Sequence, residues 1–122
     1  MENSSTLEDK KKPVILCIDD EFIILKSLSY FLKKEFGKEY DIESFNDSES
    51  ALNFIKDCNL NQIEIPLIFC DQVMPVMRGD EFLEIVHRII PNTRKIMLTG
   101  LASAESIGNA LNKANLYRYI AK

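Results

Sequence analysis

Acidic side chains follow two apolar segments of this sequence, in an arrangement that could bind a metal ion or attack phosphorus. The apolar segment Val14–Ile18 leads into Asp19 and Asp20. A second apolar segment, residues 67–70, leads directly into Asp71. An acid at the end of a buried strand needs a physical reason, because burying an isolated charge is costly.

The chemistry open to these carboxylates follows from their charge. Two unit charges about 4 Å apart repel by roughly 4 kcal/mol at an effective dielectric of about 20, so gathered carboxylates need a cation. Magnesium prefers oxygen ligands and typically uses one or two carboxylates together with waters and a phosphoryl oxygen. Asp19, Asp20 and Asp71 could hold Mg²⁺, and Lys122 could neutralise the remaining charge. A carboxylate is also a nucleophile toward phosphorus and forms an aspartyl phosphate.

Each candidate residue also has a simpler interpretation. Asp20 could cap the N-terminus of the following helix, and Asp71 could close a turn. Thr99 follows a third apolar segment, residues 95–98, and its hydroxyl could satisfy a turn. Lys122 could be a solvated charge. The metal interpretation therefore depends on whether the fold brings these residues together.

Alternating strand and helix patterns predict such a fold. Short and almost wholly apolar segments, typical of central parallel strands, occur at residues Val14–Ile18, 67–70 and 95–98. Mixed segments typical of edge strands occur at residues 40–43 and 116–121. Helical periodicity covers residues 21–36, 48–58, 80–90 and 103–114. The pattern predicts an α/β fold, an open and doubly wound five-stranded parallel sheet with helices on both faces. Ligands bind at the carboxyl ends of the strands in this architecture.

The first and last predicted helices differ in character. The helix over residues 21–36 carries a long apolar stripe, which consists of Ile24, Leu28, Phe31, Leu32 and Phe36. The helix over residues 103–114 has a thin apolar face and an internal Gly108, which costs about 1 kcal/mol relative to alanine. We expect this last helix to be the easiest to move.

Length and composition limit the remaining function classes. With 122 residues, 46% of them hydrophobic, the chain suits one globular domain. Its apolar runs fall far short of the roughly 18 residues that span a bilayer. Residues 1–13 are polar without an apolar signal segment, which predicts a disordered N-terminal arm in a cytoplasmic protein. A net charge of −4 without a basic helix argues against direct nucleic-acid binding. The three cysteines lack metal or disulfide spacing and are expected to be buried thiols.

A series of motifs is typical of one signalling family. The motifs are ILCIDDE, IFCDQVMP with Gly79 downstream, MLTG and YRYIAK. Together they resemble the receiver domain of two-component response regulators, over residues 14–122. The resemblance implies a flavodoxin-like fold with strand order 2-1-3-4-5. The family pattern continues with a proline and a fifth helix, which this sequence does not contain after Lys122.

The resemblance implies a role for each acid. Asp71 would accept a phosphoryl group from a sensor histidine kinase or a histidine phosphotransfer protein. Asp19 and Asp20 match the acidic pair that binds Mg²⁺ in the family. Val73 matches the residue whose backbone carbonyl binds the same metal.

The resemblance also implies a switch. Thr99 matches the hydroxyl that meets the phosphoryl group, Lys122 the lysine that pairs with it, and Tyr119 the aromatic switch residue. Such a domain is a signalling switch that assists its own phosphorylation and dephosphorylation, rather than a turnover enzyme. The resemblance also implies a C-terminal output domain outside this sequence. Without the fifth helix, apolar surface would be left exposed and could favour a homodimer.

Three other functions fit parts of the sequence. A receiver-like protein-interaction module would keep the fold without being phosphorylated, although the complete acidic set argues against it. A phosphatase resembling the haloacid dehalogenase family usually needs a second acid two residues after the nucleophile, where this sequence has Val73. A flavin or nucleotide binder would carry a glycine- or hydroxyl-rich loop after the first strand, where Asp19 and Asp20 would repel a bare phosphate.

Overall fold

The computed structural model describes residues 11–100 and 104–121. Of the arm predicted for residues 1–13, only residues 11–13 fall within this part, and Lys122 lies outside it. In chain order the elements are β1 (Val14–Ile18), α2 (Phe22–Phe36), β2 (Asp41–Phe45), α3 (Ser48–Leu60), β3 (Leu67–Asp71), α4 (Gly79–Ile89), β4 (Arg94–Thr99), α5 (Ala104–Lys113) and β5 (Arg118–Ala121).

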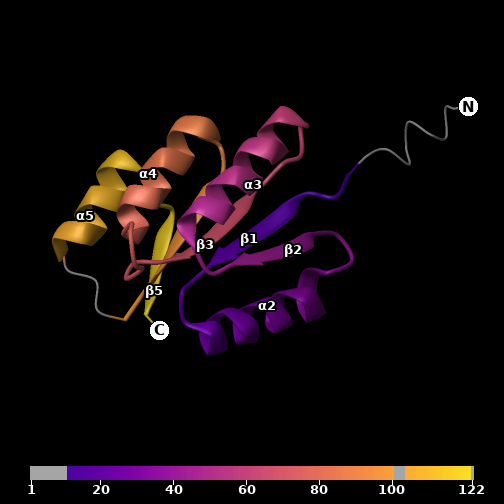
Figure 1. Ribbon diagram of the computed structural model, residues 1–122, viewed down its shortest axis with the longest axis horizontal. Coiled ribbons are helices and arrows are strands. Elements are labelled where there is room, and N and C mark those ends of the chain that lie inside the picture. Colours follow the sequence, from indigo (N-terminus) through magenta and orange to yellow (C-terminus); the bar gives the residue numbers. More distant parts are fainter. Residues whose placement is uncertain (1–10, 101–103, 122) are drawn as a thin grey trace, which may run out of the picture.

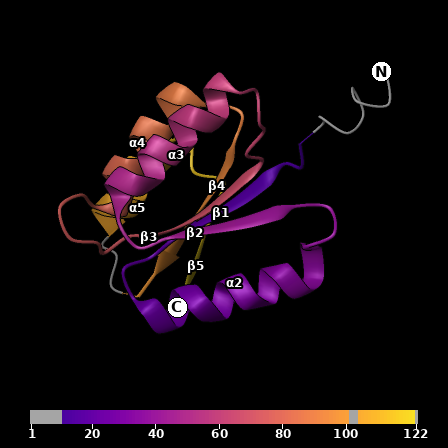
Figure 2. The same ribbon diagram turned by 45° about the vertical axis from the view of Figure 1, so that its right-hand side comes forward.

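The strands form one sheet with the order β2-β1-β3-β4-β5, and every neighbouring pair is parallel. Helix α2 lies on one face of this sheet, while α3, α4 and α5 lie on the other (Figures 1 and 2). The predicted fold class, a doubly wound five-stranded parallel sheet in the order 2-1-3-4-5, is therefore confirmed. Because all strands run the same way, their carboxyl ends share one edge of the sheet.

The element ends differ from the prediction where tertiary contacts decide them. Strand β5 begins at Arg118 rather than at residue 116, because Leu116 is buried and its N–H donates to the carbonyl of Ala110 (3.1 Å). Asn115, with a φ of 54°, makes the turn between α5 and this residue. Among the described helices, none has the length and apolar character that crossing a bilayer requires.

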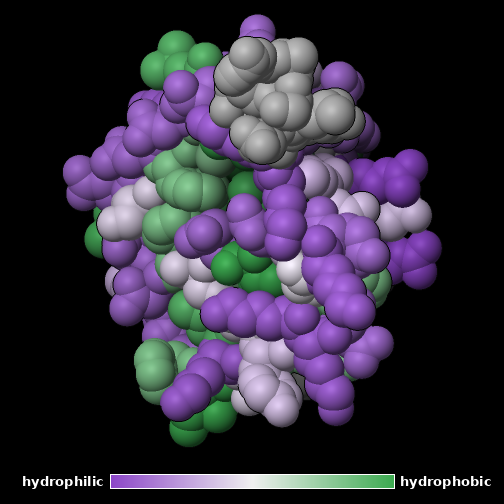
Figure 3. Space-filling model, turned by 90° about the vertical axis from the view of Figure 1, so that its right-hand side faces the viewer, coloured by the Kyte–Doolittle hydropathy of each residue, from purple (hydrophilic) through white to green (hydrophobic). Residues whose placement is uncertain are grey.

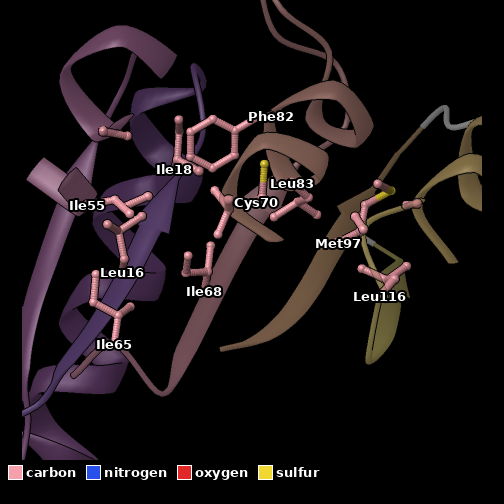
Figure 4. Packing of buried hydrophobic residues seen from close by; sticks show 14 of the residues in the cluster. Leu16, Ile18, Ile55, Ile65, Ile68, Cys70, Phe82, Leu83, Met97 and Leu116 are labelled. Carbon is pink, nitrogen blue, oxygen red and sulfur yellow. The ribbon is translucent and has the colours of Figure 1, made fainter. Parts of the chain in front are cut away.

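Most of the hydrophobic core lies between the sheet and the three helices on its α3–α5 face. Ile18 of β1 and Cys70 of β3 lie close to the fully buried ring of Phe82 from α4 (Figure 4). On the opposite face, Cys17 belongs to a smaller cluster with Leu25 of α2. The two clusters exist because successive side chains of a strand point to opposite faces of the sheet.

The apolar stripe predicted for α2 is only partly buried. Leu32 is buried as expected, but Phe31 and Phe36 are 55% and 42% exposed. Leu25, which the predicted stripe left out, is buried instead. The reason is that α2 is the only described helix on its face of the sheet, so the flanks of its apolar stripe have no neighbouring helix to pack against.

A groove of about 1010 Å³ lies beside these exposed phenylalanines. Its apolar lining includes Phe31, Phe36, Tyr40, Phe69 and Ile96. Residues just before β3 and β4 also line it, so the groove opens at the N-terminal edge of the sheet, away from the predicted site. Figure 3 views the molecule from this side and shows apolar surface between hydrophilic side chains.

Lys95 is a buried cation in strand β4, within a segment that the sequence presents as apolar. Its side chain is fully buried, and its Nζ donates to the carbonyl of Thr93 (2.7 Å) and lies 3.3 Å from Nδ1 of His87. Burial lowers the pKa of Lys95, because it disfavours the charged amine. His87 on α4 therefore lies against a buried lysine.

We expect Lys95→Met to raise the free energy of unfolding near neutral pH by about 1 kcal/mol, because it removes a desolvated charge. Because the pKa of Lys95 is lower in the folded protein, the unfolded chain binds more protons at this residue. The contribution of Lys95 to the free energy of unfolding therefore rises as the pH approaches the pKa of lysine in the unfolded chain. The advantage of the variant should therefore shrink between roughly pH 7 and roughly pH 10 in urea titrations. Subtracting the free energies of unfolding of the two proteins at each pH removes the titration of groups distant from Lys95. A difference that stays constant with pH would contradict the prediction.

Candidate functional site

Three carboxylates meet at the carboxyl edge of the sheet. Asp19 and Asp20 follow β1, and Asp71 is the last residue of the neighbouring strand β3. One carboxylate oxygen from each of the three residues lies within 4.8 Å of the others. Asp19 and Asp71 are buried, with 1% and 2% of their surface exposed, whereas Asp20 is exposed. The structure thus brings together the three acids that the sequence singled out.

Strand pairing explains why Asp19 and Asp71 lie side by side. The register pairs Ile18 with Cys70, so the next residue on each strand is an aspartate. The N–H of Asp19 donates to the carbonyl of Phe45 (3.2 Å), which continues the ladder with β2 for one more residue. The central position of β1 between two parallel neighbours therefore fixes the backbone of this acid.

The turn from β1 into α2 uses Asp19 rather than Asp20. The N–H of Glu21 donates to Oδ1 of Asp19 (2.9 Å). Glu21 is the N-cap of α2 and makes no side-chain cap hydrogen bond, so the interpretation of Asp20 as the helix cap is wrong. The exposed Asp20 carboxylate is instead part of the acidic cluster.

The donor set of this cluster fits a hard divalent cation. All three groups offer carboxylate oxygens, the ligands that Mg²⁺ prefers. Exposure of Asp20 leaves one side of the cluster open to water and to a further ligand. The negative charge also acts on the neighbouring thiol: burial raises the pKa of Cys70 well above its ordinary value, and the charges of Asp71 and Asp19 raise it further. Cys70, like Cys17 and Cys58, is a buried free thiol, as the sequence predicted.

The other predicted site residues occupy different positions. Thr99 ends β4 and is partly buried, one residue beyond Leu98, which pairs with Asp71. Its position places it at the same edge of the sheet as the acids. Val73, in the loop after β3, has a side chain that is 55% exposed. Tyr119 lies on β5 opposite Met97 and is 52% exposed.

Sequence reasoning missed a buried polar pair next to the acids. Gln72 and Asp80 are 3% and 4% exposed. Nε2 of Gln72 donates to Oδ1 of Asp80 (2.9 Å), and the N–H of Asp80 donates back to Oε1 of Gln72 (2.9 Å). The available signal was the amide of Gln72 inside the otherwise apolar stretch after Asp71.

Arg78 completes this network. Its Nε donates to Oδ1 of Asp80 (3.0 Å), and its Nη2 donates to Oδ2 of the same carboxylate (3.3 Å). Burial alone would raise the pKa of Asp80, but hydrogen bonds from Arg78 and Gln72 and the charge of Arg78 outweigh it, so the pKa is lowered. Asp80 is therefore a stable anion.

Comparisons with known proteins agree with this geometry. A profile of the family described as the response regulator receiver domain matches residues 15–122. The hydrogenase transcriptional regulatory protein HoxA of Cupriavidus necator is 31% identical over 112 residues, which cover 92% of this chain and 21% of HoxA. The chain thus spans about a fifth of the length of this curated relative.

Solved structures give the same result. A CheY-like response regulator receiver domain protein from Methanospirillum hungatei is 33% identical, with a TM-score of 0.80 over 92% of this chain and 82% of that one. The signal receiver domain of an HD domain-containing protein from Pseudomonas fluorescens is 28% identical, with a TM-score of 0.75 over 92% of this chain and 83% of that one. With the fold, the acidic edge and the profile match in agreement, the chain belongs to the response regulator receiver domain family.

Proposed function

We propose that the chain is a phosphoryl-accepting switch in which Asp71 takes a phosphoryl group from a histidine kinase or a histidine phosphotransfer protein. The observation that carries this proposal is the meeting of Asp19, Asp20 and Asp71 within 4.8 Å at the carboxyl edge of the sheet. Burial of Asp71 at the end of a rigid strand supports it, because positioning supplies much of the catalysis in phosphoryl transfer.

Receiver domains generally bind Mg²⁺ at an acidic pocket, and the residues here suit that ion. Asp19, Asp20 and Asp71 would hold it through carboxylate oxygens, and Val73 through its backbone carbonyl. When bound, the metal supplies positive charge that offsets the repulsion among the acids and the charge of the transferring group.

The transfer itself depends on residues of the chain. A carboxylate oxygen of Asp71 attacks the phosphorus of a phosphohistidine, and a new P–O bond forms as the P–N bond breaks. The electron pair of that bond returns to the imidazole nitrogen of the donor, which takes up a proton. Lys122 would pair with the phosphoryl oxygens by charge, and Thr99 would donate a hydrogen bond from its hydroxyl.

The proposed response begins with Thr99. A charge-assisted hydrogen bond contributes about 1.5 to 3 kcal/mol, enough to shift a two-state equilibrium tenfold or more. Movement of Thr99 toward the phosphoryl group would vacate space that Tyr119 could enter. The half-exposed ring of Tyr119 and its place on the edge strand β5 are compatible with such a movement. The surface of α5 and β5 would then be the output face.

The wider setting is part of the same proposal. Residues 14–122 would act as the receiver unit of a longer cytoplasmic regulator, with an output domain beyond this sequence, because the curated HoxA relative is about five times as long as the matched region. The unit would act as a switch rather than as a turnover enzyme. Contact with nucleic acid, where it occurs, would belong to the output domain.

Incubation with a small acyl-phosphate donor tests the proposal. With Mg²⁺ present, intact-mass measurement should detect one added phosphoryl group, which mild base removes because a mixed anhydride hydrolyses readily. Chelation of the metal with excess EDTA should prevent the addition. An unmodified mass under all conditions would favour the interaction module that keeps the fold without being phosphorylated.

A further inference from the structure

The loop between β3 and α4, residues 72–78, connects the strand of the proposed acceptor to the next helix. It carries Val73, whose carbonyl is the proposed fourth protein ligand of the metal. Val73 and Val76 are 55% and 101% exposed, so packing does not hold these two positions. Met74 and Met77 anchor the loop from the core side. The carbonyl of Val73 thus sits between one core anchor and the end of the strand.

The backbone of this loop is strained. Val76 has a φ of 71°, in the left-handed region that β-branched residues rarely adopt. Such a conformation costs on the order of 1–3 kcal/mol and persists only where surrounding contacts enforce it. Contacts at the two ends of the loop must therefore stabilise this conformation.

Gln72 and Asp80 supply those contacts. The main chain of Gln72 donates to the carbonyl of Leu98 on β4 (3.1 Å) and accepts from the N–H of Gly79 (2.9 Å). Its side chain forms the reciprocal pair of hydrogen bonds with Asp80 described above. Each hydrogen-bonding group of Gln72 is therefore directed to a residue of β4 or of α4.

We propose that Gln72 and Asp80 are positioning residues for the metal and phosphoryl site. The pair closes the loop between the acceptor Asp71 and helix α4, and thereby fixes the carbonyl of Val73 relative to the carboxylates. Neither side chain needs to touch the metal or the phosphoryl group. The inference rests on the proposed function, because it concerns the Mg²⁺ affinity of that same site.

The test compares two disruptive variants with a conservative one. Gln72→Met keeps the length of the side chain but removes both hydrogen bonds of the pair. Asp80→Ala removes only the one that the Asp80 carboxylate accepts, because the N–H that donates to Gln72 belongs to the backbone. Both should weaken Mg²⁺ binding about tenfold in calorimetric titration, at the lower end of effects seen for residues that support metal ligands. Asp80→Asn should recover most of the affinity lost in Asp80→Ala, since its side-chain oxygen can still accept from Gln72.

Thr93→Val is the matched control. Thr93 is also buried, and its Oγ1 donates to the carbonyl of Ile65 near the opposite edge of the sheet. This variant should lose stability while its Mg²⁺ affinity stays at the wild-type value. Hydrogen exchange in the metal-free proteins gives a second measurement: the amides of residues 73–80 should exchange faster in Gln72→Met but not in Thr93→Val.

The outcomes separate the inference from the proposed function. A wild-type protein that binds no Mg²⁺ overturns both. If the wild type binds Mg²⁺ and the two disruptive variants bind it equally well, the inference alone is overturned. Equal losses of affinity in Thr93→Val and Gln72→Met would also overturn it, because general destabilisation would then explain the effect.

Discussion

Asp71→Asn should reduce phosphoryl incorporation from an acyl phosphate by about 10³-fold or more. The amide has nearly the shape of the carboxylate but no anionic oxygen to attack phosphorus. It also removes one of the three acids proposed to hold Mg²⁺. Since Asp71 is 2% exposed and lies at the end of β3, the substitution leaves a side chain of the same size in a packed position. Intact-mass measurement with and without Mg²⁺ gives the result directly.

Asp41→Asn is a suitable control for this experiment. Asp41 is an exposed aspartate at the start of β2, so it lies at the opposite edge of the sheet from Asp71. This variant should be phosphorylated like the wild type. Circular dichroism should show that the Asp71→Asn protein remains folded, because the substitution removes one of three like charges and so lowers the repulsion within the cluster. Continued incorporation in a folded Asp71→Asn protein would place the acceptor elsewhere.

Gly79→Ala should destabilise the fold by about 3 kcal/mol, at the upper end of typical overpacking effects. A Cβ at this position would lie 2.2 Å from the carbonyl oxygen of Asp71 and 2.8 Å from Cα of Gln72. Both atoms belong to the backbone, so no side-chain rotation relieves the contact. Chemical denaturation should show the loss as a lower midpoint, and the displaced acceptor strand should also weaken Mg²⁺ binding.

Gly108→Ala provides a control of the opposite sign. Gly108 lies inside α5, and a Cβ there would meet nothing within 4 Å. Alanine in a helix interior should therefore stabilise the protein by about 0.5–1 kcal/mol. If the two substitutions changed the free energy of unfolding equally, the close approach of Gly79 to the backbone of Asp71 and Gln72 would not contribute to stability.

The sequence predicted the fold and the acidic cluster because both depend on local patterns. Short apolar runs alternating with helical periodicity specify a parallel sheet, and parallel strands bring their carboxyl ends to one edge. The position of Asp71 after residues 67–70 therefore placed it at the same edge of the sheet as Asp19, and the strand order that makes their strands neighbours was implied by the resemblance to receiver domains. The roles of Thr99 and Tyr119 remain predictions, and Lys122 lies outside the described residues.

Features that depend on tertiary pairing were not predictable in the same way. The exposure of Phe31 on α2 depends on how much of the sheet the neighbouring helices cover, which periodicity does not report. The pair of Gln72 with Asp80 joins a strand end to a helix start across a loop. Burial of Lys95 likewise contradicts the usual preference of lysine for water, and its contacts with the carbonyl of Thr93 and with Nδ1 of His87 arise only from the tertiary structure.

The pairing of β1 with β3 has a consequence for how the site comes into existence during folding. Asp19 and Asp71 are about fifty residues apart along the chain, so their meeting requires closure of a long loop whose entropy cost grows with the logarithm of its length. Helix α2, strand β2 and helix α3 all lie within that loop. A nascent chain that has produced only the first acidic pair thus lacks the third acid of the proposed metal site, and we expect that site to form in one step, when β3 pairs with β1.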